Sequence, residues 1–273
     1  MEVVVENLRK VYGSVVAVDN LSFEVSKGEI LGIIGENGAG KTTTLKILAG
    51  LIEKTSGEIY YFGKKLEKWG VEIKKKIGFL PEFDALYENL YPKEYLNLFA
   101  SIYGVGKERV DFLLDLFELP KNRMIGTFSK GMKRKLSICR TLIHDPEILI
   151  YDEPISGLDP STSLSVSEMI RNMKNKAIIF SAHNLYYVEA TCSKILIMKR
   201  GKSIYYGDIG ELRDLMKSYK LRYSMNGETF EETFESVEDL NREIKRIVES
   251  GGKIEDIETF VPRLEEIYFK LTS

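Results

Sequence analysis

Residues 35–42 read Gly-Glu-Asn-Gly-Ala-Gly-Lys-Thr, and this glycine-rich segment lies between two apolar stretches. Glu29 to Ile34 before it predicts a short buried strand, and Thr43 to Leu48 after it begins a helix, whose N-terminus favours anions. Glycines let consecutive backbone N–H groups turn toward phosphate oxygens, a lysine reaches the β and γ phosphates, and a hydroxyl binds Mg²⁺. The order strand, loop, Lys-Thr, helix predicts a nucleotide-phosphate site rather than an ordinary turn.

Length and composition narrow the class of protein. With 273 residues the chain can form one large domain and a small one. The net charge of -2 and the pI near 6.0 provide no global attraction to nucleic acid, so we expect no nucleic-acid partner. No apolar run approaches the roughly 18 to 20 residues that cross a bilayer, and Met1 leads directly into the strand-like segment Glu2 to Glu6. We therefore expect a cytoplasmic protein.

Two further features of the composition are informative. Cys139 and Cys192 are distant from each other in sequence and have no histidine at metal-ligand spacing, so we expect buried free thiols. The chain contains no glutamine, while lysine and glutamate are abundant. Avoidance of amide side chains with enrichment in Lys and Glu is typical of thermophilic proteins.

The periodicity of apolar residues divides the chain into regions. Residues 2–80 predict strands, interrupted by the glycine-rich loop and its helix, and residues 82–145 predict a helical insertion because apolar residues recur every three or four positions. Strand-like runs with helix-length segments between them then return at Ile148–Tyr151, Ala177–Phe180 and Ile195–Met198. This alternation predicts an α/β domain with a parallel sheet over residues 1–210.

A smaller α+β domain is predicted over residues 217–273. Asn226-Gly227 between two alternating segments predicts a β-hairpin. Ser236 is placed to cap a helix, and Lys253 to Phe260 with the residues after Pro262 predict a further strand and helix. The helix after Ser236 should bury one apolar face, which comprises Val237, Leu240, Ile244, Ile247 and Val248. The alternative is a plain extension that covers apolar surface of the larger domain.

An acidic pair, Asp152-Glu153, directly follows the strand-like run that ends at Tyr151. An aspartate at the end of a buried strand can hold Mg²⁺ through water, and a neighbouring glutamate can polarise the water that attacks a γ phosphate. Such a pair on its own is commonly a solvated loop. Downstream of a phosphate loop it favours metal binding and hydrolysis.

Two more segments carry a resemblance to a known family. Phe128 to Met132 lies at the start of a predicted helix, and Ser156 to Asp159 follows the acidic pair. With these segments in order, the chain resembles the ATP-binding cassette (ABC) family of ATPases over about residues 2–210. The resemblance implies a P-loop NTPase (RecA-like) core with an antiparallel β subdomain and an α-helical subdomain at about residues 82–145, followed by the small α+β domain.

The resemblance also implies roles for individual residues. Tyr12 would stack on adenine, Phe128 to Met132 would be the signature segment, and Ser156 to Asp159 would communicate across a dimer. His183 would sense the γ phosphate, whereas we expect His144 to be structural. The implied nucleotide-binding residues are Tyr12, Gly35, Asn37, Gly38, Ala39, Gly40, Lys41, Thr42, Thr43, Ser129, Gly131 and Asp159. The implied metal-binding residues are Thr42, Glu82 and Asp152, and the implied catalytic residues are Glu153, His183 and Glu82.

The chain departs from the family pattern at two places. Glu82 replaces the usual glutamine after Leu-Pro, and Lys130-Gly131-Met132 replaces the usual Gly-Gly-Gln. Glu82 keeps an oxygen for Mg²⁺ and water, and Ser129 with Gly131 keeps a hydroxyl and an N–H for phosphate, so we expect hydrolysis to be retained. The signature form and the chain end at Pro262 to Leu271 resemble the ATPase subunits of ABC-2-type exporters.

Family geometry places the phosphate loop and the signature on distant faces, so the resemblance implies a head-to-tail dimer, of this chain or with a close paralogue, around two MgATP. Separate transmembrane permease subunits would bind beside Glu82 and the helical subdomain, at the cytoplasmic face of the cell membrane. A soluble ABC ATPase acting in translation or DNA maintenance is the alternative, although such relatives usually carry two cassettes or a long coiled coil. A non-hydrolysing module is the third reading, which Asp152-Glu153 and His183 argue against.

Overall fold

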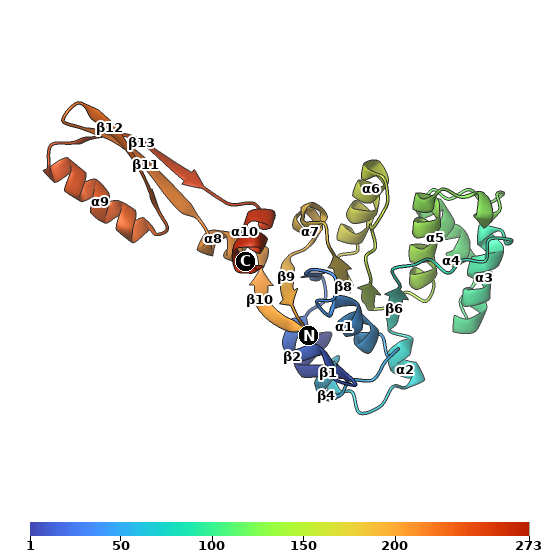
Figure 1. The fold of residues 1–273 in the computed structure, drawn as a ribbon. Helices are drawn as coiled ribbons and strands as arrows, with labels where there is room; N and C mark the ends of the chain where they lie inside the picture. Colours follow the sequence, from blue (N-terminus) through green and yellow to red (C-terminus); the bar gives the residue numbers. More distant parts are fainter. Residues whose placement is uncertain (273) are drawn as a thin grey trace. The chain divides into compact units, whose positions relative to one another are not determined.

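The computed structural model describes residues 1–272 and divides into two compact units, Met1–Tyr206 and a second unit that begins at Gly207 (Figure 1). The first ten strands are β1 (Val3–Tyr12), β2 (Val15–Val25), β3 (Ile30–Ile34), β4 (Ser56–Tyr61), β5 (Lys64–Lys65), β6 (Ile77–Leu80), β7 (Ile148–Tyr151), β8 (Ala177–Ala182), β9 (Lys194–Lys199) and β10 (Lys202–Asp208). The helices of the first unit are α1 (Lys41–Leu48), α2 (Val71–Lys74), α3 (Pro92–Tyr103), α4 (Lys107–Leu116), the 3₁₀ helix η1 (Ile125–Thr127), α5 (Lys130–Leu142), α6 (Pro160–Arg171) and α7 (Leu185–Thr191).

The six-stranded sheet of the first unit has the order β10-β9-β3-β8-β7-β6. The pairs β9/β3, β3/β8, β8/β7 and β7/β6 are parallel, which confirms the predicted parallel sheet. β3, β7 and β8 are buried along their whole length, as expected for parallel strands covered on both faces. Parallel strands end at the same edge of a sheet. The phosphate loop, Glu82, Glu153 and His183 therefore all follow strands at one edge.

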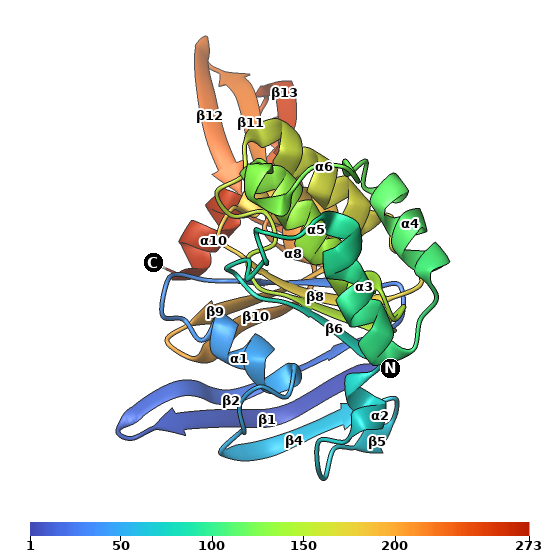
Figure 2. The same cartoon turned by 90° about the vertical axis from the view of Figure 1, so that its right-hand side faces the viewer.

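A second, antiparallel sheet has the order β2-β1-β4-β5. Figure 2 shows α1 between this sheet and the six-stranded one. One apolar core joins the three layers, because Leu45 and Leu48 of α1 are fully buried together with residues of both sheets. The Tyr61 hydroxyl of β4 donates to the carbonyl of Leu48 at 2.5 Å. The antiparallel β subdomain therefore packs directly on the helix that follows the phosphate loop.

Helices α3, α4 and α5 pack together as a helical subdomain. The prediction that helix begins near Glu82 is wrong, since residues 81–91 form no helix and α3 begins at Pro92. Proline is favoured in the first turn of a helix, and the Glu94 carboxylate accepts a bond from the Tyr91 N–H at 2.9 Å, which fixes this start. Phe83 and Tyr87 in the non-helical segment are consequently exposed.

The second unit contains α8 (Ile209–Leu215), β11 (Ser218–Met225), β12 (Glu228–Phe234), α9 (Val237–Glu249), β13 (Lys253–Phe260) and α10 (Leu264–Thr272). Its sheet has the order β12-β11-β13 and is antiparallel. The hairpin at Asn226-Gly227 is confirmed, with both residues at positive φ (55° and 85°). The cap at Ser236 is also confirmed, because its Oγ accepts from the Asp239 N–H at 3.0 Å.

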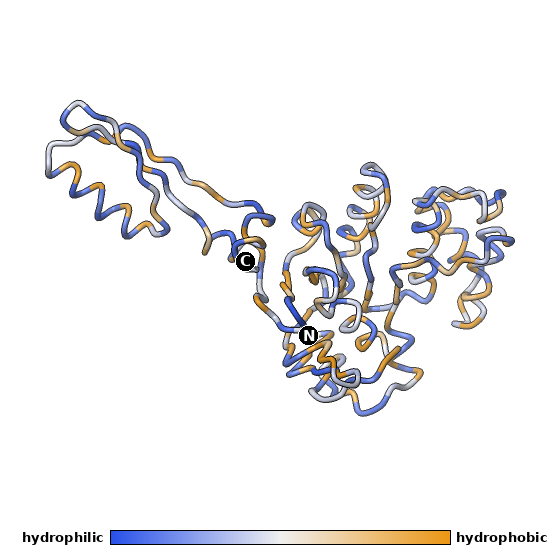
Figure 3. The backbone as a smooth tube through the Cα atoms, viewed as in Figure 1, coloured by the Kyte–Doolittle hydropathy of each residue, from blue (hydrophilic) through white to orange (hydrophobic). Residues whose placement is uncertain are grey.

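The buried face of α9 is narrower than predicted. Leu240 and Ile247 are buried against Leu221 and Tyr223 of β11. Val237 and Val248 are instead exposed, at 43% and 58%, so the prediction that they are buried is wrong. A three-stranded sheet covers only one stripe of a helix. At about 100° per residue, Val237 and Val248 lie about 60° to 80° around the helix from Leu240, both on the same side, and so they face away from the sheet. Figure 3 shows the resulting alternation of apolar and polar residues along α9.

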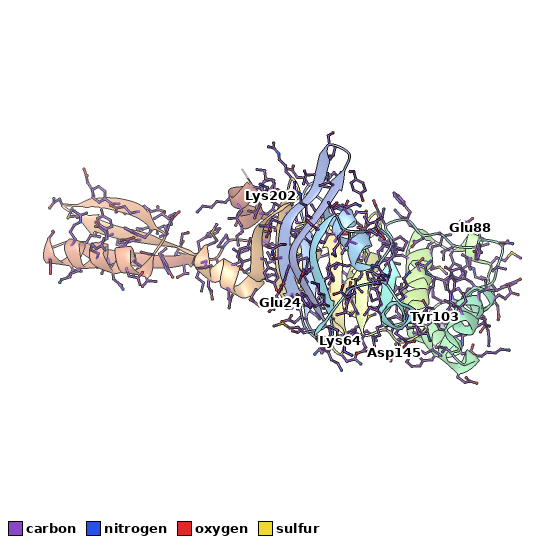
Figure 4. The ribbon with its side chains drawn as sticks, turned by 90° about the horizontal axis from the view of Figure 1, so that it is seen from below. Glu24, Lys64, Glu88, Tyr103, Asp145 and Lys202 are labelled. Atoms are coloured by element: carbon purple, nitrogen blue, oxygen red, sulfur yellow. The ribbon has the colours of Figure 1, made fainter. Side chains whose placement is uncertain are left out.

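Both cysteines are free. Within residues 1–272, no three or more His, Cys, Asp or Glu side chains are grouped so that together they could hold a metal ion. Cys139 belongs to α5. The Sγ of Cys192 lies against Gly32, so closely that a Cβ added to Gly32 would be 2.7 Å from it. Burial raises the pKa of both thiols. His144 stacks on Tyr103 (labelled in Figure 4), with ring centroids 3.9 Å apart.

No helix in the described residues is both long and apolar enough to span a lipid bilayer.

Candidate functional site

The glycine-rich loop has a backbone that only glycine adopts readily. Gly38 and Gly40 lie at φ of +83° and +103°, in the left-handed region, and a Cβ on Gly40 would be 2.5 Å from the carbonyl oxygen of Ala17. α1 starts at Lys41, and no side chain caps its first turn. Its first N–H groups therefore remain available to an anion. The loop thus has the form of a phosphate cradle.

Lys41 and Thr42 carry the polar groups of this cradle. Lys41 is buried, and its Nζ donates to the carbonyl oxygens of Gly35 at 2.6 Å and Glu36 at 3.3 Å. The ammonium group is therefore held at the loop, where it would donate to phosphate oxygens in place of these carbonyls or in addition to them. The Thr42 hydroxyl donates to Oδ1 of Asp152 at 3.1 Å, which joins the loop to the end of β7.

Asp152 and Glu153 are both buried at the end of β7. Oδ1 of Asp152 accepts a second bond from the Ser181 hydroxyl at 2.7 Å. Glu153 has a φ of +48°, in the left-handed region, and its N–H donates to the Ser181 Oγ at 2.8 Å. Its Oε2 lies 2.7 Å from Nδ1 of His183. A carboxylate that is oriented by an imidazole can accept a proton from water.

A cavity of about 360 Å³ opens beside this loop. It is lined by Tyr12, Val15, Val16, Ala17, Glu36, Asn37, Gly38, Ala39, Gly40, Lys41, Thr42, Thr43, Glu82 and Glu153. The Tyr12 ring is half exposed, and Nζ of Lys10 lies over it, 4.7 Å from its centroid. A half-exposed aromatic ring can stack on a planar group. The structure therefore brings Tyr12, the phosphate loop and Glu82 together with Glu153.

Four predicted nucleotide-binding residues do not line this cavity: Gly35, which is the first residue of the loop, and Ser129, Gly131 and Asp159. Ser129 caps α5, since its Oγ accepts from the Met132 N–H at 3.2 Å. Asp159 caps α6 and accepts from the hydroxyl of Ser161 as well as from both the hydroxyl and the N–H of Thr162. These hydrogen bonds hold the pKa of the Asp159 carboxyl well below its usual range. Ser129 and Asp159 are thus the N-caps of α5 and α6, and Gly131 lies in the first turn of α5.

The N-termini of α5 and α6 contact each other through Gly131. A Cβ on Gly131 would lie 2.6 Å from Cγ2 of Thr162, so a larger residue could enter only by separating the two helices. Lys130, which replaces the usual glycine of the signature, extends its side chain over Gly157 in the loop before α6. The signature segment and the Ser156 to Asp159 loop therefore form one continuous surface.

Ser181 and Arg134 belong to the site although their roles were not predicted. Ser181 bridges Asp152 and Glu153, and Arg134 of α5 donates to the backbone carbonyls of both. A serine next to a predicted histidine carries no signal of its own. Arg134 lies among the lysines 130, 133 and 135, and nothing in that basic run marks it as the buried member.

A parallel α/β sheet with a phosphate loop after one strand and an Asp-Glu pair after another defines a P-loop nucleotide-hydrolysing protein. Residues 18–156 match the family model described as ABC transporter. The ABC transporter ATP-binding protein NatA of Bacillus subtilis (strain 168) is 39% identical over 216 residues, which cover 76% of this chain and 88% of that protein. The chain therefore belongs to the ABC transporter family, as an ATP-binding subunit that hydrolyses ATP.

Other relatives and solved structures agree with this family. The Nod factor export ATP-binding protein I of Cupriavidus metallidurans (strain ATCC 43123 / DSM 2839 / NBRC 102507 / CH34) is 35% identical over 216 residues, covering 76% of this chain and 71% of that protein. A solved ATP-binding subunit of an ABC transporter superposes over 100% of both chains, with a TM-score of 0.74 and 27% identity. A dimeric ATP-binding cassette bound to ADP and Pi shares the fold at a TM-score of 0.69 and 24% identity, over 76% of this chain and 98% of that one.

Proposed function

We propose that this chain is the motor subunit of an exporter and that it hydrolyses MgATP between two copies paired head to tail. The observation that carries the proposal is the division of the site. Tyr12, the phosphate loop, Glu82 and Glu153 share one cavity, whereas Ser129 and Gly131 lie outside it. A second chain would supply the missing half, as the dimeric form of the related cassette suggests.

The surface that would meet the partner's nucleotide suits an anion. The N-termini of α5 and α6 are in contact, and helix N-termini favour negative charge. Lys130 adds a positive side chain beside them. In the proposed dimer, Ser129 and Gly131 of one copy would donate to the γ phosphate held by Lys41 of the other, so ATP would close the pair and hydrolysis would open it.

Within one copy, the residues divide the chemistry between them. Glu153 would accept the proton of the attacking water, and His183 would hold the Glu153 carboxylate in position. Lys41 and the first N–H groups of α1 would bind the phosphates. Phosphate binding would place the γ phosphorus in line with this water, which is the main requirement of phosphoryl transfer.

Magnesium, when bound, would neutralise charge on the β and γ phosphates. The Thr42 hydroxyl and the Asp152 carboxylate, which already contact each other, would hold it, with an oxygen of Glu82, which lines the same cavity as Thr42. These are the hard oxygen ligands that Mg²⁺ prefers, and it usually takes only one or two of them from the protein. The small number of acidic side chains at this position therefore fits a metal that completes its coordination with phosphate and water.

The proposal of export rests on the relatives, and the proposal of membrane attachment rests on one exposed surface. A relative carries the description Nod factor export, and we extend export to this chain. Phe83 and Tyr87, in the non-helical segment that follows Glu82, are 79% and 58% exposed, and such aromatic side chains suit a protein partner. We propose that a separate membrane subunit binds there, which would hold this chain at the cytoplasmic face of the membrane.

The substitution Glu153→Gln tests the mechanism. Without the proton-accepting carboxylate, hydrolysis should slow by about a hundredfold or more, whereas ATP should still bind because the phosphate contacts remain. The trapped ATP should then hold two chains together. Steady-state phosphate release, ATP binding and light scattering with MgATP measure the three quantities.

Wild-type protein with MgADP is the control for this experiment and should remain monomeric. A Glu153→Gln protein that binds ATP but stays monomeric would contradict the shared site. A variant that hydrolyses ATP at the wild-type rate would show that another group accepts the proton.

A further inference from the structure

Arg134 is the most heavily hydrogen-bonded side chain near the site. It lies on the second turn of α5, is 3% exposed, and uses all three guanidinium nitrogens. Nε donates to the Pro154 carbonyl at 2.8 Å, and one terminal nitrogen donates to the carbonyls of Asp152 at 3.0 Å and Glu153 at 2.8 Å. One face of the guanidinium thus holds three consecutive backbone carbonyls after β7.

The other terminal nitrogen reaches a different segment. It donates to the Pro81 carbonyl and to Oδ1 of Asp84, each at 2.8 Å, and Asp84 forms an ion pair with Arg134. Pro81 and Asp84 flank Glu82, which lines the cavity. A single planar group therefore bonds the segment around Glu82 and the segment around Glu153, and its fixed fork of donors sets the distance between them.

The backbone of Glu153 needs such support. Its φ of +48° is disfavoured for any residue with a Cβ, and no glycine-like freedom is available to it. Its N–H is held by Ser181, and its carbonyl accepts from Arg134 at 2.8 Å and from the Ser156 N–H at 3.2 Å, so the peptide on each side of the residue is fixed. Without the bond to Arg134, only the longer bond from Ser156 would hold this carbonyl, so the backbone could relax out of the left-handed region, and the carboxylate would move with it.

We propose that Arg134 is a positioning residue for hydrolysis, which acts by holding Glu153 in its left-handed conformation and by joining it to the segment around Glu82. This inference rests on the proposed role of Glu153. It assigns Arg134 no contact with the nucleotide, since Arg134 does not line the cavity. A displacement of the Glu82 segment would reach Glu153 through the guanidinium, so a partner bound at that segment could control the rate of hydrolysis.

The first test compares Arg134→Met and Arg134→Lys with wild type. Because small misplacements of a catalytic group cost up to about a hundredfold in rate, kcat should fall by about 10- to 100-fold in both, with KM for ATP changed less than about threefold. Lysine restores the charge but not the fork, so it should recover part of the lost Tm without recovering kcat. A wild-type kcat in either folded variant would overturn the proposal.

Lys176→Met is the matched control. Lys176 is also a buried cation that bonds a carboxylate and a backbone carbonyl, those of Asp145 (labelled in Figure 4) and Pro146, but it precedes β8, at the opposite edge of the sheet. Its loss should lower Tm and leave kcat unchanged. If Lys176→Met reduces kcat as much as Arg134→Met does, the effect is general destabilisation and the proposal fails.

A second test asks whether Arg134 acts through Glu153. In a Glu153→Gln background, Arg134→Met should cause less than about a twofold further loss, because groups that act as a unit are not additive. A full additional 10-fold loss would show an independent route and overturn the proposal. Glu153→Gln alone tests the proposed function, so failure of that function is distinguishable from failure of this inference.

Asp84→Asn covers the case in which Arg134 variants do not fold. It keeps the four carbonyl bonds of Arg134 and weakens only the ionic contact on the Glu82 side. We expect kcat to fall about 3- to 10-fold at unchanged KM, since the fork is then held less firmly on that side. An unchanged kcat would overturn the link between the two segments.

Discussion

Gly131 is a single residue whose size controls the contact between α5 and α6. A Cβ there would meet Cγ2 of Thr162 at 2.6 Å, and Thr162 cannot retreat freely because Asp159 holds it by two hydrogen bonds. Gly131→Ala should therefore push the two helix N-termini apart. We expect the ATPase rate to fall at least about tenfold, since misplaced groups lose catalysis steeply, while ATP affinity is retained because Gly131 lies outside the cavity. Phosphate release and binding of a fluorescent ATP analogue measure the two effects.

Gly70→Ala is the control for Gly131→Ala. A Cβ on Gly70 meets open space, its φ of −116° suits any residue, and it lies outside the cavity. Both the rate and the affinity should match wild type. Loss of ATP affinity in Gly131→Ala would mean that the two halves of the site are not separate.

Among the residues of the site, those with a fixed sequence pattern were predictable. The phosphate loop, Asp152-Glu153 and His183 each follow a recognisable strand, and the structure brings Glu153 and His183 within 2.7 Å. Arg134 was not predictable, because whether one cation in a basic helix is buried depends on the segments around Pro81 and Glu153, which are distant in sequence. The catalytic and binding roles of the phosphate loop, Asp152-Glu153 and His183 remain predictions that variants can test.

Helix α9 is an element whose two neighbouring residues, Ile247 and Val248, face opposite environments. Ile247 is 1% exposed in the core of the second unit and Val248 is 58% exposed. Ile247→Ala should therefore destabilise that unit by about 2–5 kcal/mol, the usual cost of removing a buried aliphatic side chain. Val248→Ala should change stability by less than about 0.5 kcal/mol. Differential scanning calorimetry of the full chain measures both, and equal effects would contradict the burial pattern of α9.

The elements differ in how far the sequence predicts them. The hairpin at Asn226-Gly227 and the cap at Ser236 follow from local chemistry, and both were predicted correctly. The start of the helical subdomain was not, because apolar spacing in residues 82–91 imitates a helix that the first-turn proline, Pro92, delays. The exposure of Val237 depends on the width of the sheet below α9, which periodicity cannot report.

For the whole molecule, we propose that the second unit is separable from the ATPase unit. The division at Tyr206 leaves every predicted nucleotide-binding, metal-binding and catalytic residue in the first unit, and the second has a core of its own around Leu221 and Tyr223. A chain ending at Met216 should therefore fold, bind ATP and keep basal hydrolysis within about threefold, while dimer stability or control by a partner decreases. Circular dichroism melting, ATP binding and light scattering check this.

An insoluble shortened chain, or one that melts early and no longer binds ATP, would show that the second unit is required by the first. The full-length chain in the same buffer provides the reference for each measurement. The sequence predicts a boundary near this point from composition alone, but it does not predict whether two units depend on each other for stability, because that depends on surfaces which only folding creates.

The two thiols have a practical consequence for observing the motor at work. Cys139 and Cys192 are the only cysteines; Cys139 is buried and Cys192 half-buried, and desolvation raises the pKa of each thiol, so little reactive thiolate forms near neutral pH. The natural chain thus serves as a quiet background for maleimide dyes. One cysteine introduced on an exposed position of α6 would take the label selectively, and fluorescence between two labelled copies would report opening and closing in real time.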